Sequence, residues 1–510
     1  MPSSVVHRRA PLQSPVTPMM SRDGPPAREA CGLVGVFTPG RQAAQMTSAA
    51  LHVLQHRGEE AAGMAVADGT KIESRRGLGL VSQVFDQLCL QGLRGHLAVG
   101  HTRYSTSGPS TRQNAQPVLD RYARFALAHN GNLVNASAFE DATLSDDTSH
   151  LTSEYASSDS HIMTRLISRS LDLPPANDSE PDELVCALRQ TLPLLRGAFT
   201  LVLLDRDRLI AVRDPHGLRP LSLGRLPQGW VVASETPAIE AIGGTVIRDV
   251  EPAELLLIDE HGPRAMHWTT ASPRACLFEY VYLTRPDSVV AGRSVYEARH
   301  ASGRLLARDA PPGSADLVIG VPDSAIPAAL GYAEEAQLPY ALGFVRSPYV
   351  GRTFMQPVQK LRSDGLPLKL AAIGAVVRGQ RLVVVDDSIV RGTTQQFIVR
   401  ALRDAGAAQV HLRIASPPIR WPCFYGFDFS TDKQLIAASL TVDELASELD
   451  VDSLEYLSLA GLISAVGIPQ EGLCRACMDG QYPIPQEGSA SVRPNWTEPP
   501  LAAPGCSRST

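Results

Sequence analysis

Short apolar segments recur between residues 31 and 257, separated by polar or turn-forming stretches. Spacing of this kind predicts short strands, which we expect at residues 31–37, 97–100, 125–129, 199–205, 209–213 and 230–234. Segments with helical periodicity lie at residues 46–54 and 160–168. Closely spaced strands with helices between some of them favour antiparallel sheet layered with helices.

The pattern changes after a turn-rich stretch at residues 259–273. Apolar strands then alternate with helical segments, at residues 317–321, 325–336, 382–385, 395–405 and 410–414. This alternation predicts a doubly wound parallel sheet. The expected fold class is therefore a two-domain combination of α+β and α/β, with a layered antiparallel domain at residues 31–265 and a parallel-sheet domain at residues 266–485.

The two ends of the chain do not share either pattern. Residues 1–30 form a leader that contains Pro and Ser but little apolar periodicity, and residues 486–510 are rich in Pro, Gly and Ser. Composition of this kind does not build a packed core. We expect the tail to be disordered and the leader to be dispensable for the fold.

Composition narrows the class of protein. The 510 residues allow several domains with large cores, and the net charge of −6 disfavours general nucleic-acid binding. No apolar run approaches the roughly 18 residues of a membrane span, and the N-terminus lacks the apolar core of a signal peptide. We expect a cytoplasmic enzyme that binds neither nucleic acid nor a membrane.

The segment at residues 381–394 carries the strongest chemical signal. A buried strand runs directly into Asp386 and Asp387, and a small turn precedes the next helix, with the residues Arg391, Gly392, Thr393 and Thr394. N–H groups at a helix N-terminus can bind a phosphate, and acids at the carboxyl end of a parallel strand can hold ribose hydroxyls or hydrated Mg²⁺. Two acids after a strand can also be a solvated strand end. The whole segment resembles the motif with which phosphoribosyltransferases bind phosphoribosyl pyrophosphate (PRPP).

A second signal is Cys31, which heads an apolar strand directly after the leader. Taken alone, such a cysteine is more often a small buried hydrophobe. Three further segments, at residues 56–58, 100–106 and 128–132, together resemble the glutaminase domain of the N-terminal-nucleophile amidotransferases. The resemblance implies that the leader is cut between Ala30 and Cys31. The freed α-amino group, with a pKa near about 8, would then activate a thiol whose ordinary pKa is about 8.5.

The same resemblance implies the rest of the glutamine site. Arg103 would hold the α-carboxylate of glutamine, and Asp159 would hold its α-amino group. The side-chain amide of Asn130 and the backbone N–H of Gly131 would form the oxyanion hole, although Asn-Gly is also a hairpin turn signal. The chain departs from the family pattern at two positions, Glu59, where relatives usually carry glutamine, and His161, where an acid is commoner.

Cysteines supply a third group of candidates. Cys474 and Cys477 form a C-x-x-C pair, and Cys276 and Cys423 add two thiols. Four thiolates suit a tetrahedral zinc or a 4Fe-4S cluster, and their spacing does not choose between the two. Residues 278–288 and 416–426 resemble the iron–sulfur branch of the amidophosphoribosyltransferase family, which implies a 4Fe-4S cluster on these four cysteines.

The resemblance extends from Cys31 to about residue 485 and implies further roles. Ser324 would lie near Mg²⁺, and Arg352 belongs to a segment that would close over PRPP. The implied activity is hydrolysis of glutamine at Cys31 and transfer of the ammonia to PRPP, which gives 5-phosphoribosylamine, glutamate and pyrophosphate in the first step of purine synthesis. The family further implies a homotetramer inhibited by purine nucleotides.

Three alternatives account for part of the sequence. An amidotransferase that forms glucosamine phosphate would share the Cys31 half but has no reason to carry the two adjacent acids. Asparagine synthetase would need a Ser-Gly-Gly pyrophosphatase loop, which the sequence does not contain. A PRPP-sensing regulator without catalysis would have no use for Cys31.

Overall fold

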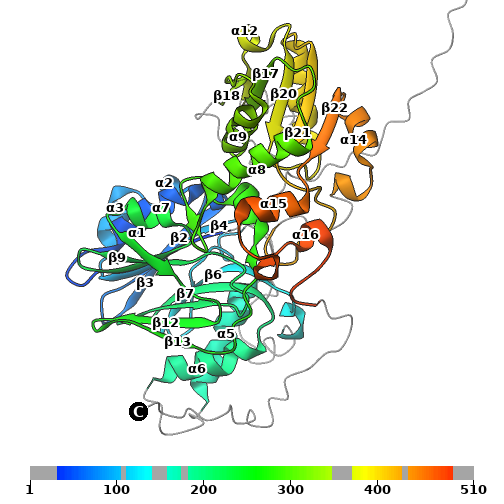
Figure 1. Ribbon diagram of the computed structural model, residues 1–510. Helices are drawn as coiled ribbons and strands as arrows, with labels where there is room; N and C mark the ends of the chain where they lie inside the picture. The colour runs from blue at the N-terminus through cyan, green and yellow to red at the C-terminus, as the bar shows by residue number, and fades with distance from the viewer. Residues whose placement is uncertain are drawn as a thin grey trace, which may run out of the picture.

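The computed structural model describes residues 31–104, 111–139, 158–173, 182–346, 370–427 and 435–485. The expected leader and tail, and also Arg352, lie outside these residues. Figure 1 shows two units, a pair of stacked sheets built from the first half of the chain and a smaller sheet with helices built from the second half.

Two antiparallel sheets make up the first unit. The first has the strand order β11-β9-β10-β1-β4-β2-β3 and the second β13-β12-β8-β7-β6-β5. The strands of the first are β1 (Gly32–Phe37), β2 (Ala61–Ala67), β3 (Ile72–Leu78), β4 (Leu97–Arg103), β9 (Ser222–Leu226), β10 (Gly229–Ala233) and β11 (Thr245–Asp249). Those of the second are β5 (Val118–Leu119), β6 (Ala126–Leu133), β7 (Gly197–Leu204), β8 (Leu209–Arg213), β12 (Glu254–Asp259) and β13 (Gly262–His267).

The core of this unit lies between the two sheets. Leu33 and Val99 of the first sheet pack against Val202 and Leu256 of the second. The sheets approach closely at Gly35, where a Cβ atom would lie 2.7 Å from Cγ1 of Val202. Any larger residue there would push the sheets apart.

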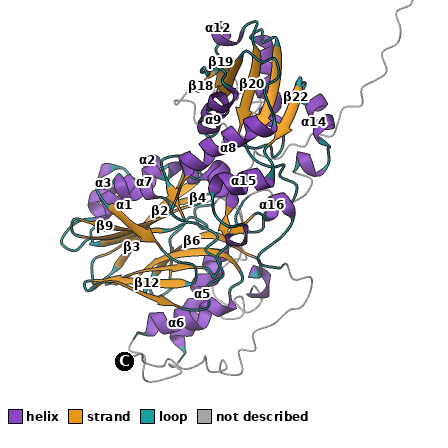
Figure 2. Ribbon diagram, viewed as in Figure 1, coloured by secondary structure: helices purple, strands orange, loops and turns teal. Residues whose placement is uncertain are grey.

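Helices cover the outer faces of both sheets (Figure 2). The first sheet is covered by α1 (Ala43–Val53), α2 (Val81–Val84), α3 (Gln87–Gly92) and α7 (Thr236–Glu240). The second is covered by α5 (Asp159–Asp172) and α6 (Glu183–Thr191). Short 3₁₀ turns are η1 (Gln55–Arg57), η2 (Ala136–Phe139) and η4 (Leu192–Leu194). The layered antiparallel architecture expected from the sequence is confirmed.

A parallel sheet forms the centre of the second unit. Its strands are, in spatial order, β17 (Leu317–Gly320), β20 (Arg381–Asp386), β21 (Gln409–Ile414) and β22 (Ser453–Tyr456). A parallel bridge from Val318 to Tyr340 extends the sheet on the other side of β17. The chain therefore reverses its direction of winding between β17 and β20, which is where doubly wound sheets bind ligands. The doubly wound parallel sheet is confirmed.

Both faces of this sheet are covered. Alternate residues of β20 point to opposite faces, so Val383 and Val385 pack in one core and Leu382 and Val384 in the other. The first core includes α8 (Val295–Asp309), α9 (Ile326–Ala336) and α15 (Leu459–Val466). The second includes α13 (Thr393–Asp404) and α14 (Val442–Glu448). Smaller elements are α12 (Gly374–Val377), β15 (Val289–Val290), β16 (Arg293–Ser294), β18 (Phe344–Arg346), β19 (Leu370–Ala372), η8 (Ile436–Ala438) and η9 (Gln470–Gly472).

Segments distant in sequence meet at the junction of the two units. The strand β14 (Ala275–Cys276) pairs in parallel with β23 (Leu473–Cys474), and the π-helical turn η5 (Glu279–Leu283) and α16 (Ala476–Asp479) lie in the same region. The predicted domain boundary at residue 265 falls inside β13, whose pairing with β12 continues to His267. None of the helices in the described ranges is long and apolar enough to cross a membrane.

Candidate functional site

Three residues predicted for the glutamine site point into the space between the two antiparallel sheets. In the β1–β4 ladder Leu33 lies opposite His101, so Cys31 comes next to Arg103 at the end of that ladder. Leu33 faces the inter-sheet core, and side chains two residues apart on a strand share a face, so Cys31 and Arg103 face that core too. On β6, Ala128 faces the same core, and so does Asn130.

Cys31 is buried, with 7 % of its surface exposed. Its Sγ atom lies 3.4 Å from the carbonyl oxygen of Tyr104, and the N–H of Tyr104 lies 3.5 Å from the sulfur. Burial raises the pKa of the Cys31 thiol, while the Tyr104 backbone and the Arg103 charge act in the opposite direction. A thiol in this environment needs a local base to become a nucleophile.

Asn130 is buried without hydrogen-bond partners. Its side chain is 1 % exposed, and neither its Nδ2 nor its Oδ1 atom has a partner among the described residues. Most buried amides in folded proteins are paired, and an unpaired one costs about 1–3 kcal/mol. An amide that accepts this cost and points into a site next to a thiol is suited to bind an oxyanion formed there.

The backbone of Gly131 suits the second hydrogen-bond donor of an oxyanion hole. Its φ is +134°, and a Cβ atom would lie 2.1 Å from the carbonyl oxygen of Ala198 on the neighbouring strand. Only glycine can adopt this backbone in this space. The strand is further held by His101, whose Nε2 lies 3.2 Å from the carbonyl oxygen of His129. Burial lowers the pKa of His101 to about 3, so this side chain is neutral.

Arg103 and Asp159 provide opposite charges at this site. Arg103 is 4 % exposed, and burial lowers its pKa while the Cys31 and Glu60 charges raise it. Asp159 begins α5, accepts a 2.8 Å hydrogen bond from the N–H of Leu133, and has a pKa that burial raises to about 6. A bound ammonium group would compensate the charge of this carboxylate.

The two departures from the family pattern lie close to this site. His161 Nδ1 and Ser158 Oγ form a 2.6 Å hydrogen bond. Burial lowers the pKa of His161 to about 4, and the charges of Arg76, Arg165 and Arg103 lower it further. The side chain is therefore neutral at pH 7. Glu59 is partly exposed and follows Gly58, where a Cβ atom would lie 2.6 Å from the Arg103 carbonyl carbon.

The two acids of the second site lie at the carboxyl end of β20, at the switch point of the parallel sheet. Ser324, in the loop after β17, donates a hydrogen bond to Asp387, and Ser388 Oγ donates another over 2.6 Å. Gln395 Nε2 donates to Asp386 over 2.8 Å. Burial raises the pKa of both acids, that of Asp386 to about 8 with the Asp387 charge as a second cause.

The predicted phosphate turn follows these acids. Gly392 has φ +82°, and a Cβ atom there would lie 2.8 Å from Cδ1 of Ile436. Helix α13 begins at Thr393, two residues earlier than expected, so Thr393 and Thr394 form its first turn. Arg391 is 7 % exposed beside this turn. The segment therefore places helix N–H groups next to the two acids, as phosphate binding requires.

The four predicted cluster cysteines line one cavity at the junction of the two units. Cys276 and Cys474 lie side by side in the β14–β23 pairing, Cys477 belongs to α16, and Cys423 follows β21. All four are free thiols. Burial raises the pKa of Cys276 to about 12 and also raises those of Cys474 and Cys477.

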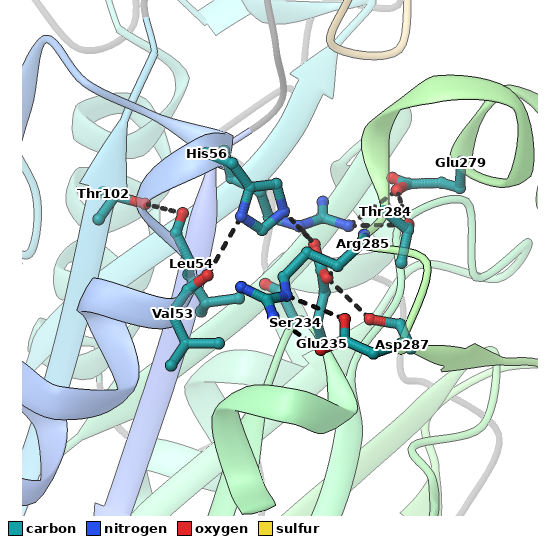
Figure 3. A network of polar contacts seen from close by, with 12 residues as sticks. Val53, Leu54, His56, Thr102, Ser234, Glu235, Glu279, Thr284, Arg285 and Asp287 are labelled. Carbon is teal, nitrogen blue, oxygen red and sulfur yellow. Dashed lines mark hydrogen bonds and ion pairs between the residues drawn. The ribbon is translucent and has the colours of Figure 1, made fainter. Parts of the chain in front are cut away.

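A buried ionic network connects the two units (Figure 3). Arg57 of η1 is fully buried; it donates through Nε to Glu235 and through Nη2 to Glu279 over 2.8 Å. His56 Nε2 lies 2.7 Å from Glu235, which also accepts the Arg285 N–H over 3.0 Å. Burial would raise the pKa of Glu235, but the Arg57 and His56 charges lower it overall. The network fixes η1, next to Arg103, against the second unit.

The sequence did not indicate this network. The motif at residues 56–58 was noted without a role for Arg57, and Glu235 lies in a segment with no special pattern. Glu279 lies in the segment 278–288, which was noted only for its resemblance at the cluster. Their partners are 178 and 222 residues away in the chain. A second missed residue is Arg299 of α8, which is buried and donates to the carbonyl oxygens of Tyr280 and Thr284, each over 2.7 Å.

A small cavity is shared by residues of this junction and one of the two acids. It is lined by Tyr280 and Val281 of η5, by Arg299 of α8, and by Ser324 and Asp387. In the described part of the chain, no group of three or more His, Cys, Asp or Glu side chains is arranged to hold one metal ion.

Comparisons with known proteins show which family the chain resembles. A family profile for the glutamine amidotransferase domain matches residues 101–241. Amidophosphoribosyltransferase of Mycobacterium tuberculosis is 49 % identical to this chain over 486 residues, which cover 93 % of this chain and 90 % of the relative. Amidophosphoribosyltransferase of Bacillus subtilis is 43 % identical, and the match covers 89 % of this chain and 94 % of the relative.

Two solved structures match nearly the whole fold. Glutamine PRPP amidotransferase from B. subtilis, complexed with ADP and GMP, superposes with a TM-score of 0.81 at 41 % identity, covering 91 % of this chain and 99 % of that one. A structure described as the allosteric regulatory enzyme of purine biosynthesis gives 0.82 at 42 % identity over 92 % and 100 %. The chain belongs to the amidophosphoribosyltransferase family, glutamine-dependent enzymes of the first step of purine biosynthesis.

Proposed function

We propose that this chain hydrolyses glutamine at Cys31 and passes the ammonia to PRPP at Asp386 and Asp387. The observation that carries the proposal is the presence of two built sites on one chain. One is a buried thiol that shares a face with Arg103 and an unpaired Asn130 amide, and the other is a pair of buried acids at the switch point of a parallel sheet. Neither site alone explains the whole chain.

The glutaminase half-reaction begins with the thiol. Removal of the leader frees the α-amino group of Cys31, which takes the thiol proton, and the thiolate adds to the amide carbon of glutamine. Asn130 Nδ2 and the Gly131 N–H donate to the oxyanion, while Arg103 and Asp159 hold the substrate's carboxylate and ammonium groups. The C–N bond then breaks, ammonia leaves with the transferred proton, and water hydrolyses the thioester to give glutamate.

The second half-reaction takes place at the buried acids. Burial raises the pKa of both carboxylates, and the Asp387 charge raises that of Asp386 further, so the pair fits a divalent cation, and oxygen ligands suit magnesium. Asp386, Asp387 and Ser324 would hold Mg²⁺, which when bound neutralises charge on the departing pyrophosphate. Ammonia attacks C1 of PRPP, the bond from C1 to the pyrophosphate oxygen breaks, and the new ammonium group loses a proton to solvent to give 5-phosphoribosylamine.

The turn at residues 391–394 would hold the phosphate of PRPP. The N–H groups of Thr393 and Thr394 at the start of α13 and the guanidinium of Arg391 supply donors and positive charge. Gly392 allows the turn because its backbone has a positive φ. Arg352, outside the described residues, stays a prediction for closure over the substrate.

Ammonia would reach PRPP through the cavity between η5 and the acids. That cavity is lined by Tyr280 and Val281, which belong to the same turn as Glu279 of the ionic network, and by Ser324 and Asp387. Ammonia is small and neutral, so a mainly apolar path carries it without the cost of burying a charge. Enclosure also keeps it from protonation in bulk water.

The four cysteines would hold a 4Fe-4S cluster. Four free thiols from three separate segments share one cavity, and thiolates are the usual ligands of such clusters. They do not converge on a point as one metal ion would require, but a 4Fe-4S cluster takes one thiolate on each of its four irons and needs no such convergence. When bound, the cluster would cross-link β14, the loop after β21, and the β23–α16 segment. It supplies no part of the transfer chemistry in this scheme.

Regulation and assembly are further parts of the proposal. The B. subtilis structure is a complex with ADP and GMP, so we propose that purine nucleotides inhibit this enzyme too. We further propose a homotetramer that acts in the cytoplasm. Sedimentation of the purified enzyme with and without GMP measures both the assembly and its response.

A labelling experiment tests the proposed function as a whole. Glutamine carrying ¹⁵N in its amide is mixed with PRPP, Mg²⁺ and excess unlabelled ammonium, and the phosphoribosylamine is trapped and weighed by mass spectrometry. Internal transfer predicts ¹⁵N in most of the product. Product labelled only in proportion to free ammonia would contradict the internal route, and absence of product would contradict the function.

A further inference from the structure

The cysteine cavity contains one buried cation that the proposed reaction does not use. Arg219 lies between β8 and β9 in the glutaminase half, and 1 % of its surface is exposed. Its side chain lines the same cavity as the four thiols. Of the described residues that line this cavity, Arg219 is the one that carries a charge besides the cysteines.

Arg219 is held by both cysteine-bearing segments. Its Nε and Nη2 atoms donate to the carbonyl oxygen of Tyr425 over 3.2 and 2.8 Å, and the Tyr425 N–H donates to Cys423 Sγ over 3.4 Å. Its Nη1 donates over 3.2 Å to Glu279, three residues after Cys276. The guanidinium also stacks on Phe427 at 4.7 Å. These contacts use the planar fork of arginine and fix its position.

Groups around Arg219 are buried as the guanidinium itself is. Glu279 is 1 % exposed and Cys474 is 8 % exposed, and the four thiols line the same cavity wall as Arg219. Buried ions persist when they are paired, and four thiolates here would otherwise have no cation on the cavity wall.

We propose that Arg219 is the counter-charge of the cysteine-held cluster, supplied by the glutaminase half of the chain. The inference rests on the proposed 4Fe-4S cluster. Four thiolates give such a cluster a net negative charge, and a fixed cation beside it stabilises the more reduced form. Oxidation in air transfers one electron from the cluster to dioxygen, which becomes superoxide. Arg219 opposes that loss and so protects the cluster.

The test compares variants that change charge with variants that keep it. Arg219→Met removes the cation, and Arg219→Lys keeps it without the fork. Arg225→Met removes an exposed arginine on β9 that stacks on Trp230, and serves as the control for lost charge elsewhere. Glu279→Gln removes a negative charge that contacts Arg219, so its effect should have the opposite sign.

Two readouts follow the cluster itself and not the enzyme's activity. One is the midpoint potential of anaerobic protein, and the other is the rate at which absorbance near 400 nm is lost in air. For Arg219→Met we expect the equilibrium for reduction of the cluster to become about tenfold less favourable, which lowers the midpoint potential by about 59 mV for one electron. We also expect the absorbance near 400 nm to be lost several-fold faster in air. Arg219→Lys should stay within about twofold of the parent in the same equilibrium.

Iron analysis of the parent separates the two claims. A parent without iron contradicts the proposed cluster and leaves Arg219 without a role. With iron present, an Arg219→Met protein whose potential and rate of loss equal those of the parent and of Arg225→Met overturns the inference. If Arg219→Met does not fold, Glu279→Gln decides, because a raised potential supports the inference and an unchanged one overturns it.

Discussion

Replacing Asn130 by alanine should lower glutamine-dependent activity without lowering the stability of the fold. The substitution removes an amide with no partner among the described residues, and an unpaired buried amide costs about 1–3 kcal/mol. The lost packing of a truncated side chain offsets part of that gain. We therefore expect a free energy of unfolding equal to the parent's or up to about 1 kcal/mol higher.

The same change removes one donor from the oxyanion hole. Loss of such a donor lowers kcat by about 10²–10³-fold, or about 2.7–4 kcal/mol. Glutamine-dependent synthesis of phosphoribosylamine should fall by this factor. Synthesis from ammonium should stay unchanged, because the second site does not use Asn130.

The neighbouring asparagine provides a matched control. Asn132 Nδ2 donates to the carbonyl oxygen of Phe424 over 3.0 Å, so Asn132→Ala loses a hydrogen bond and about 1 kcal/mol of stability. Urea unfolding and steady-state kinetics on both variants measure the contrast. An Asn130→Ala protein that is less stable than the parent by more than about 1 kcal/mol, or that keeps glutaminase activity within about twofold, would refute the reasoning.

Three further predictions follow from the site and the junction. Asp387→Ala should abolish PRPP turnover with either nitrogen source, whereas Asp404→Ala, at an exposed position on α13, should not. Unchanged pyrophosphate release in Asp387→Ala would contradict the assignment of PRPP to the two acids. Arg57→Met should lower the free energy of unfolding by about 3–5 kcal/mol because it leaves the buried Glu235 and Glu279 without this cation. Arg121→Met, in an exposed pair with Asp172, should lower it by at most about 1 kcal/mol, and urea unfolding measures both. Glutamine binding needs the ionised Asp159, whose pKa burial raises to about 6, so kcat/KM for glutamine should fall as pH drops through 6 by more than kcat/KM for ammonia expressed per concentration of free NH3; equal pH profiles on that scale would contradict that role.

Local pattern predicted the elements that depend on local chemistry. The range 209–213 coincides with β8, and the strand before the two acids coincides with β20 to within a residue at each end. The start of α13 was placed too late, because the positive φ of Gly392 closes the turn earlier than the polar sequence suggests. Strands β2 and β3 were not predicted. Their sequences are rich in alanine and arginine, and the pairing of each with a neighbouring strand determines their conformation.

Candidate residues were predicted where a motif names the chemistry, and missed where only tertiary contact creates it. Cys31, Asn130 and Asp387 belong to recognisable motifs, and the structure places them in buried sites. Arg219 belongs to no such motif, and Glu279 was noted only within the segment 278–288 without a role. Their contact was missed because the two residues lie 60 positions apart in the chain. The sequence also could not show that the cysteine cavity borders the glutaminase half, since that contact depends on how the two units pack.

The central claim is that one chain holds two chemically separate sites joined by ammonia. The most direct measurement is phosphoribosylamine formation by Cys31→Ser, with glutamine and with ammonium as nitrogen sources, beside Cys89→Ser as a control at a cysteine outside the site. The account predicts no glutamine-dependent product and full ammonium-dependent product from Cys31→Ser, and both activities from Cys89→Ser. Glutamine-dependent synthesis that survives in Cys31→Ser would contradict it.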